Sequence, residues 1–344
     1  MRMLEIRTPT RYPVCIGSGL LEKAVQNAPE GPKAVLYDLK VERFADEAAQ
    51  KLGIEHKLGL QGGEDAKTLA VFARCQSWLA QAALPRNAVL YVIGGGTLTD
   101  LGGYVAASYL RGIRYISLPT TTLAVVDASV GGKTGLNLPE GKNLMGAFHS
   151  PAAVYSDTGP LATLPTTLFK EGLVEAFKHG MIAGNPSLLD LSRLAPDYEG
   201  LEDYLAKAVS VKIDIVEKDP TEQGERRKLN LGHTLAHGLE AATRHALSHG
   251  AAVAYGLLFA ALLGRKLGGQ DLVPTVQKLM AWLEPAPLPI IHWDALLPYL
   301  ARDKKKLGND VHWVVPKDLG RLEIGPVAEE TLRETHRELL SLTS

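Results

Sequence analysis

Val89-Leu-Tyr-Val-Ile-Gly-Gly-Gly-Thr-Leu-Thr-Asp100 is the stretch of sequence that decides the fold. Its first five residues are apolar, which predicts a buried strand over residues 89–93, and a helical pattern follows over residues 97–109. A strand, a glycine turn and a helix N-terminus together offer backbone N–H groups and a favourable dipole to a pyrophosphate. The glycines do not form the G-x-G-x-x-G fingerprint, so the motif by itself is only a weak indication of a dinucleotide site.

Strands and helices alternate around this stretch until about residue 158. Further strands are predicted at residues 14–16, 34–37, 115–118 and 153–155, and further helices at residues 40–52 and 66–82. Because strand, helix and strand follow one another, we predict an α/β domain. Its sheet should be mostly parallel, doubly wound and Rossmann-like, with helices on both faces.

The helical pattern dominates after about residue 160. Helices are predicted at residues 166–183, 198–218, 227–243, 250–267, 271–283 and 327–342, and only residues 312–315 look like a strand. A chain of 344 residues is longer than one core usually supports. We therefore predict an α/β domain over residues 1–158 and a mainly α-helical domain over residues 159–344, with the active site in the cleft between them.

Charge and composition exclude several classes of protein. A formal net charge of −1 gives no whole-surface field for nucleic acid or an anionic membrane, so any basic site must be local. The N-terminus lacks the apolar run of a signal peptide, and the longest apolar run, residues 251–264, is too short for a bilayer and predicts a buried helix. Cys15 and Cys75 match no metal or redox spacing, so we expect them to be reduced. We expect a cytoplasmic protein whose partners include neither nucleic acid nor a membrane.

A second polar stretch, Asp127-Ala-Ser-Val-Gly-Gly-Lys-Thr134, is continued by Gly141-Lys-Asn143. Bulky side chains are scarce in it, so it is unsuited to a core. Glycine lets the backbone approach a ligand closely, while Lys133, Lys142 and Asn143 supply charge and hydrogen bonds for an anion. We interpret the stretch as the floor of a site for a phosphorylated or carboxylated small molecule. The alternative is a glycine-rich turn with solvated lysines.

Polar residues also follow other predicted strands. Asp38 ends the strand at residues 34–37, where an acid can accept hydrogen bonds from a ribose, but it can equally cap the next helix. Gly62-Gly-Glu64-Asp-Ala-Lys67 and Thr120-Thr121 add polar groups on the side where parallel strands end. Ligand clefts of such sheets lie on that side.

Two histidines, His233 and His237, lie four residues apart in a predicted helix, so both imidazoles share one face. Arg226 and Asn230 extend that face backwards at helical intervals. A polar row of this kind in an apolar domain is costly unless it meets a metal or an anion. No glutamate follows His233 directly, so the pattern is not the H-E-x-x-H zinc motif.

A second predicted helix carries Glu175 and Lys178, three residues apart, so both can point into the same cleft. A glutamate and two histidines would leave a zinc ion open to substrate oxygens. Spacing does not choose among His237, His245 and His249 for the remaining ligand. For each histidine taken singly, the alternative is a structural role.

In chain order these motifs resemble the 3-dehydroquinate synthase family along nearly the whole length. The likeness is carried by residues 94–96 with Asp100, and by residues 119–121, 126–134, 141–143, 172–178, 229–233 with His237, 249–250 and 303–305. Two positions in the presumed NAD loops differ from the family pattern. The family usually has aspartate where Gly62 stands and glycine where Thr99 stands.

The resemblance implies NAD as cofactor and one divalent metal ion, Zn²⁺ or alternatively Co²⁺, bound by Glu175, His233 and His249. It implies NAD contacts at Asp38, Gly63, Glu64, Lys67, Gly95, Gly96, Thr97, Asp100, Thr120, Thr121, Asp127, Lys133, Lys142, Leu161 and Thr163. It implies substrate contacts at Arg111, Lys133, Lys142, Asn143, Lys178, Lys212, Arg226, Asn230, His237, Lys304 and Lys305. The implied catalytic residues are His237, Lys178, Lys133, Asp127 and Glu222. A homodimer is also implied, in which Arg111 reaches the neighbouring active site.

The implied activity is conversion of 3-deoxy-D-arabino-heptulosonate 7-phosphate to 3-dehydroquinate and phosphate, a step of the shikimate pathway toward aromatic amino acids. Another sugar-phosphate cyclase, such as 2-deoxy-scyllo-inosose synthase, is an alternative whose substrate lacks the carboxylate. Arg226 and Lys212 can pair with that carboxylate and favour the first activity. More distant alternatives are a metal-dependent polyol dehydrogenase of the glycerol dehydrogenase kind and a catalytically silent nucleotide-binding regulator.

Overall fold

The computed structural model describes residues 1–8, 10–304 and 311–343. The chain forms two compact units, each built from two segments. The first unit comprises Met1–Phe169 and Ala195–Pro220, and the second comprises Lys170–Leu194 and Thr221–Ser344.

A seven-stranded sheet forms the centre of the first unit, in the order β1-β2-β9-β6-β5-β3-β4. Its strands are β1 (Arg2–Arg7), β2 (Arg11–Gly17), β3 (Lys33–Asp38), β4 (His56–Leu60), β5 (Val89–Gly94), β6 (Arg114–Pro119) and β9 (Ala153–Asp157). Only β1 and β2 pair antiparallel in this sheet, and every other neighbouring pair is parallel. The mostly parallel sheet predicted from the sequence is confirmed, although β1 and β4 were not predicted.

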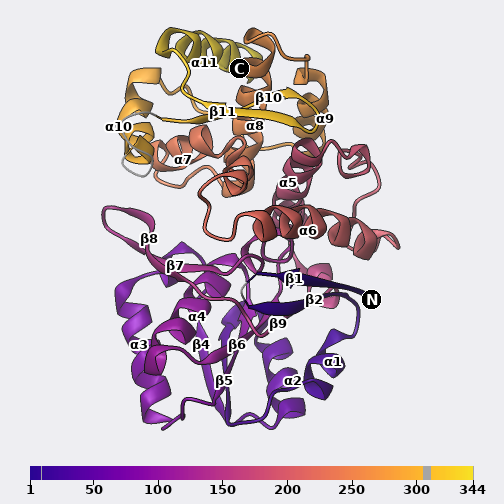
Figure 1. Cartoon of the computed structure of the whole chain (residues 1–344), viewed down its shortest axis with the longest axis vertical. Helices are drawn as coiled ribbons and strands as arrows, with labels where there is room; N and C mark the ends of the chain where they lie inside the picture. Colours follow the sequence, from indigo (N-terminus) through magenta and orange to yellow (C-terminus); the bar gives the residue numbers. More distant parts are fainter. Residues whose placement is uncertain (9, 305–310, 344) are drawn as a thin grey trace. The chain divides into compact units, whose positions relative to one another are not determined.

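Side chains alternate between two cores along each central strand, as the period of two requires. In β3, Val35 packs with α1 (Leu20–Gln26) and α2 (Glu42–Leu52). The adjacent Leu36 packs with α3 (Leu69–Gln81) and α4 (Gly96–Ser108) on the opposite face. Figure 1 shows these two helix pairs on either side of the strands. The prediction of a doubly wound sheet is confirmed.

Gly102 allows α4 to pack closely against β5. A Cβ atom at this position would lie 2.6 Å from the side chain of Val92, which is closer than atoms can approach without a shift. Glycine therefore sets the distance between the helix and the strand. Only Gly95 separates β5 from α4, so the first turn of α4 begins directly beside the carboxyl end of β5.

An antiparallel hairpin, β7 (Lys133–Leu138) and β8 (Gly141–Phe148), follows the π-helix η4 (Ala124–Ala128). Sequence periodicity did not predict this hairpin. The unit is completed by α6 (Leu201–Lys218), which contacts β1 and η4, and by the short helices η1 (Leu39–Val41), η2 (Glu64–Ala66), η3 (Tyr109–Arg111) and η5 (Gly159–Thr163).

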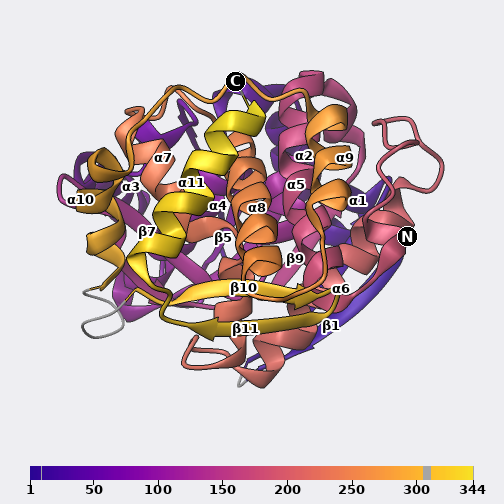
Figure 2. The same ribbon diagram turned by 90° about the horizontal axis from the view of Figure 1, so that it is seen from above.

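The second unit is mainly helical. It contains α5 (Thr166–Ala183), α7 (His233–Ala242), α8 (His249–Lys266), α9 (Val273–Leu283), α10 (Trp293–Lys304), α11 (Glu329–Thr343), η6 (Pro186–Leu188), η7 (Glu225–Asn230), β10 (Trp313–Asp318) and β11 (Arg321–Gly325). Every residue of α8 from Gly250 to Gly264 is buried, because α7, α9, α11 and β10 surround it (Figure 2). The predicted buried helix is confirmed. No helix in the described part of the chain has the length and hydropathy that a membrane span requires.

The predicted helix over residues 227–243 is wrong in its first half. The 3₁₀ helix η7 ends at Asn230, and Gly232 then adopts a left-handed backbone with φ 78° before α7 begins. A Cβ atom on Gly232 would lie 2.9 Å from the backbone nitrogen of Leu257, so α7 and α8 approach too closely there for any side chain. Arg226 and Asn230 therefore do not lie on the helix that carries His233. The helices α1 and α10 and the strand β11 were also not predicted.

Candidate active site

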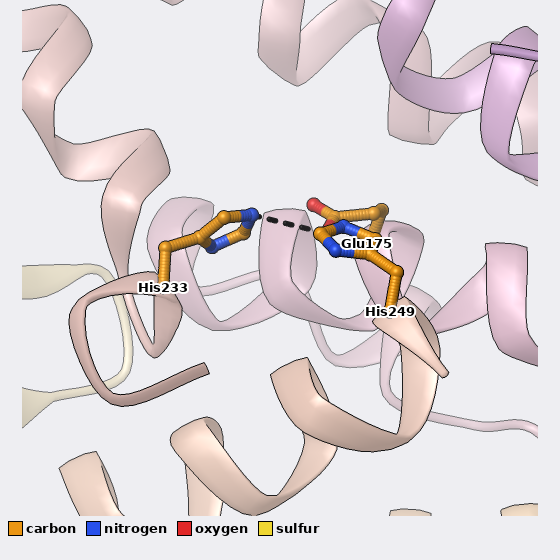
Figure 3. A group of neighbouring side chains, drawn as sticks. All are labelled: Glu175, His233 and His249. Atoms are coloured by element: carbon orange, nitrogen blue, oxygen red, sulfur yellow. Dashed lines mark ion pairs between the residues drawn. The ribbon is translucent and has the colours of Figure 1, made fainter. Parts of the chain in front are cut away.

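Glu175, His233 and His249 converge on one point in the second unit. Glu175 lies in the middle of α5, while the two histidines are the first residues of α7 and α8. The Nε2 atom of His233 lies 3.3 Å from Glu175 Oε1, and that of His249 lies 3.5 Å from the same oxygen. Figure 3 shows both imidazoles directed at the carboxylate. One ligand atom from each residue lies within 4.8 Å of the others.

These separations fit a zinc site. Ligands at about 2.0–2.1 Å from a tetrahedral zinc ion lie roughly 3.3–3.4 Å from one another. Glu175 is 1% exposed, yet neither of its oxygens has a hydrogen bond of normal geometry among the described residues. Lys178 pairs with Oε2 of this buried carboxylate, whereas Oε1 faces the Nε2 atoms of both histidines, so three ligand atoms converge on one point. The residues present therefore fit a divalent metal, with three protein ligands and room for substrate oxygens.

The second nitrogen of each imidazole faces an acceptor. His233 Nδ1 lies 3.2 Å from the carbonyl oxygen of Leu231, and His249 Nδ1 lies 3.5 Å from Glu240 Oε1. An acceptor at Nδ1 favours a proton there and leaves the Nε2 lone pair free for a metal. Sequence reasoning missed Glu240. Its position seven residues after His233 on one helix face was a usable signal.

The pKa values of Glu175 and His249 are strongly perturbed by their neighbours. Burial raises the pKa of the Glu175 carboxyl, but Lys178 and His233 together hold that pKa well below its usual range. Lys178, itself 1% exposed, forms an ion pair with Glu175. Burial lowers the pKa of His249, but Glu175 and Glu240 outweigh this and raise it to about 10.

Other predicted residues of the second unit lie on the segments around this group. The ring of His237 makes an edge contact with that of His233, with 5.5 Å between centroids. Asn230 Nδ2 donates to Glu222 Oε1 at 2.9 Å, and Glu222 has a left-handed backbone with φ 61°. Arg226 in η7 is 1% exposed. His245 is exposed and is not part of the converging group.

Two predicted substrate contacts fall outside the described residues. Lys305 is one, and the side chain of Lys304, at the end of α10, is the other.

In the first unit, most predicted NAD contacts follow the carboxyl ends of five parallel strands. They are Asp38 at the end of β3, Gly63, Glu64 and Lys67 after β4, Gly95, Gly96, Thr97 and Asp100 after β5, Thr120 and Thr121 after β6, and Leu161 and Thr163 after β9. Carboxyl ends of parallel strands meet at one edge of a sheet, where α/β proteins bind ligands. The structure thus brings these residues to one edge of the first unit.

Asp38 has the capping contact that was one of its two interpretations. Its Oδ1 accepts a hydrogen bond from Lys40 N at 3.0 Å. Its other oxygen, Oδ2, lies over Gly62, where an added Cβ atom would be only 1.9 Å away. The departure from the family pattern at Gly62 therefore leaves space that the Asp38 carboxylate occupies.

Lys67 connects the loop after β4 to α4 and to the hairpin. Its Nζ donates to Asp100 Oδ2 at 2.7 Å and to Asn143 Oδ1 at 2.6 Å. Burial raises the pKa of the Asp100 carboxyl although Lys67 opposes this. Asn137, which sequence reasoning missed, donates to Glu64 Oε2 at 2.7 Å. No local pattern distinguishes it from an ordinary polar strand residue.

The remaining predicted residues of the first unit lie in or near η4, the hairpin and η3. Lys212 Nζ donates to Asp127 Oδ1 at 2.6 Å and to the Asp127 carbonyl oxygen at 2.5 Å. Lys133 is exposed at the start of β7, and Lys142 Nζ lies 4.0 Å from a carboxylate oxygen of Glu64. Arg111 in η3 has a left-handed backbone with φ 67°.

Comparison with known proteins identifies the family. The 3-dehydroquinate synthase N-terminal model matches residues 57–171, and the 3-dehydroquinate synthase C-terminal model matches residues 172–306. The chain belongs to the 3-dehydroquinate synthase family. A 3-dehydroquinate synthase of Nocardia farcinica is 40% identical over 345 residues, which cover 94% of this chain and 92% of that protein. One from an Arthrobacter species is 38% identical over 337 residues, covering 93% and 92% respectively.

A solved structure of 2-deoxy-scyllo-inosose synthase has the same two-domain fold. It superimposes with a TM-score of 0.88 at 26% identity and covers 98% of this chain and 100% of its own. That protein is complexed with carbaglucose-6-phosphate, NAD⁺ and Co²⁺. Members of the 3-dehydroquinate synthase family are enzymes that use NAD and a divalent metal, and the Glu175 group fits the second requirement.

Proposed function

We propose that this 3-dehydroquinate synthase family member converts 3-deoxy-D-arabino-heptulosonate 7-phosphate to 3-dehydroquinate and inorganic phosphate. The single observation that carries the proposal is the convergence of Glu175, His233 and His249 in a chain that belongs to this family. The reaction proceeds by transient oxidation, phosphate elimination, reduction, ring opening and aldol closure. It returns NAD to its starting state in every turnover.

In the proposed metal site, Glu175, His233 and His249 hold Zn²⁺, with Co²⁺ as the alternative. When bound, the ion polarises the hydroxyl group to be oxidised and lowers its pKa. Glu240 and the Leu231 carbonyl keep the two histidines in the tautomer that ligates through Nε2.

NAD is proposed to bind at the carboxyl edge of the first-unit sheet, mainly to residues 1–158, with further contacts in η5. When bound, it accepts a hydride from the substrate and later returns it. The first turn of α4 supplies backbone N–H groups for the pyrophosphate. The proposed side-chain contacts are those of Asp38, Glu64, Lys67, Thr97, Asp100, Thr120, Thr121, Asp127, Lys133, Lys142 and Thr163.

The cationic residues are proposed to neutralise the carboxylate and phosphate of the substrate, which otherwise repel each other. The proposed contacts are Lys133, Lys142, Asn143, Lys178, Lys212, Arg226, Asn230, His237, Lys304 and Lys305. Of these, Lys178, Lys212 and Arg226 are buried, so that water screens their charge little.

His237 is proposed to take the proton of the hydroxyl group during oxidation, directly or through water. Lys178, Lys133, Asp127 and Glu222 complete the proposed catalytic set. The ketone formed at the oxidised carbon acidifies the neighbouring C–H, so the departing phosphate is a sufficient base for the elimination. We further propose a cytoplasmic homodimer in which Arg111 contributes to the partner's site.

The test is incubation of purified protein with NAD, zinc and the heptulosonate phosphate. Release of phosphate with formation of the carbocyclic product, and with no net NADH, is the expected result. Accumulation of free NADH would instead indicate a dehydrogenase. Turnover of glucose 6-phosphate in place of the heptulosonate phosphate would indicate a 2-deoxy-scyllo-inosose synthase, whose substrate lacks the carboxylate.

A further inference from the structure

Asn137, in β7, is hydrogen-bonded to two segments that are proposed to bind different ligands. Its Nδ2 donates to Glu64 Oε2 at 2.7 Å, and its Oδ1 accepts from the backbone nitrogen of Asn143 at 3.0 Å. Glu64 is a proposed NAD contact and Asn143 a proposed substrate contact. One carboxamide thus links both loops.

Lys67 closes this link into a ring. Its carbonyl oxygen accepts from Asn137 N at 2.8 Å, and its own N–H donates to the Glu64 carbonyl oxygen at 3.0 Å. Its Nζ donates to the side chain of Asn143 at 2.6 Å. Because Lys67 is 2% exposed, the ring is anchored on a buried ammonium group that water screens little.

The ring holds Asn143 in an unusual conformation. Asn143 has φ 55°, in the left-handed region that asparagine adopts more readily than most non-glycine residues but that is uncommon within a strand. Asn137 holds its backbone N–H, and Lys67 holds its side chain. Lys142, a proposed contact of both ligands, directly precedes Asn143, so the ring also restricts the position of its backbone.

We propose that Asn137 is a positioning residue that couples NAD binding to substrate binding. NAD contacts order Glu64, and Asn137 transmits this order to the backbone N–H of Asn143, which is thereby held in place for the anionic substrate. Each ligand therefore strengthens the binding of the other by the same factor. The inference rests on the proposed function, because it needs both ligands.

Calorimetric titration of the full-length, zinc-loaded enzyme with the heptulosonate phosphate tests the coupling. Titrations are compared with and without saturating NADH, which cannot accept a hydride and so prevents turnover. In the wild type, NADH should lower the Kd of the sugar phosphate at least fivefold. In Asn137→Leu, which keeps the size but not the hydrogen bonds, the two Kd values should agree within twofold. In the reciprocal titration, the sugar phosphate should lower the Kd of NADH by the same factor in the wild type, and Asn137→Leu should lose this effect.

Two further variants separate coupling from hairpin stability. Thr134→Val removes a hairpin hydrogen bond outside the ring, from Thr134 Oγ1 to the Ala147 carbonyl oxygen at 2.8 Å, and should keep the wild-type ratio. Asn137→Asp should lose the coupling, since two carboxylates then face each other. Adding Glu64→Gln should restore part of it, because the introduced carboxamide can donate to the introduced carboxylate.

An unchanged ratio in Asn137→Leu, an equal loss in Thr134→Val, or a wild-type ratio of one would each overturn the coupling while leaving the proposed function intact. A wild-type enzyme that binds neither NADH nor the sugar phosphate would contradict the proposed function itself, and this inference with it.

Discussion

The Glu175 group of the second unit and the Asn137 ring of the first unit hold polar residues together in opposite ways. Glu175, in α5, is 1% exposed and faces histidines from α7 and α8, so its buried charge must be met by other charges or a metal. Glu64 and Asn143 are exposed and lie on a loop and a hairpin. Exposed hydrogen bonds contribute little individually, since water competes for them. A change in the first group should therefore have a large effect on function, and a change around the second a graded one.

The largest effect is expected for Glu175→Gln. The carboxamide keeps the shape but removes the charge that faces both histidines, so zinc affinity should be lost and turnover should fall at least about 10³-fold. Elemental analysis measures the zinc content, and phosphate release measures the turnover. Glu171→Gln, one turn earlier on α5 and bonded to Ser248 instead, is the matched control and should keep its zinc. Normal zinc content in Glu175→Gln would show that Glu175 is not a zinc ligand.

A smaller effect is expected for Glu240→Gln, because Glu240 contacts the metal site only through the Nδ1 atom of His249. Losing the acceptor charge at Nδ1 should weaken zinc binding by roughly 10- to 100-fold. At saturating zinc the stoichiometry should remain one ion per chain. Competition with a chelator gives the affinity. If the affinity equals that of the wild type, Glu240 does not orient His249.

In the first unit, Gly62→Ala should have a graded effect. The new Cβ would lie 1.9 Å from Asp38 Oδ2 and must displace that carboxylate. If Asp38 binds a ribose, NAD affinity should fall roughly tenfold, about the value of one hydrogen bond to a charged group. Fluorescence titration with NADH measures it, and zinc content should not change. Unaltered NADH affinity would leave Asp38 with its capping role alone.

The smallest effect is expected for His336, a buried histidine of the second unit outside the Glu175 group, and it concerns stability. His336 is 2% exposed, and its Nε2 has no hydrogen-bond partner among the described residues. Burial, with a smaller contribution from His292, lowers its pKa below the usual value of 6.5. A lowered pKa means that the unfolded state binds the proton more tightly, so stability is present above pH 6.5 and is lost as pH falls through the folded pKa. His336→Phe should reduce the drop in melting temperature between pH 7.5 and pH 5.5. If the variant shows the same drop in melting temperature as the wild type, other titrating groups cause that drop.

The sequence predicted the elements whose periodicity is local. The strand at β5, the glycine turn and the buried helix α8 follow from apolar runs and glycine positions, and the structure confirms them. The hairpin β7–β8 was missed because glycines and lysines hide its alternation. The break at Gly232 was missed because its cause is the close approach of Leu257, which is distant in sequence.

The site could be predicted only in part, because several of its contacts join residues that are distant in sequence. Spacing grouped His233 with His237, which are neighbours on α7, whereas His249 comes from another helix and was selected through family resemblance. Asn137 has its partner Glu64 73 residues away, so only the fold brings the two together. Glu240 could have been predicted from the sequence, since it shares a helix face with His233.

The proposed function depends most on one metal ion bound by Glu175, His233 and His249. Anomalous diffraction at the zinc edge, from crystals of the zinc-loaded enzyme, tests this directly. We expect one strong peak at about 2.0–2.2 Å from a Glu175 oxygen and from the Nε2 atoms of both histidines. A peak at any other set of residues, or no peak at this one in zinc-loaded protein, would contradict it.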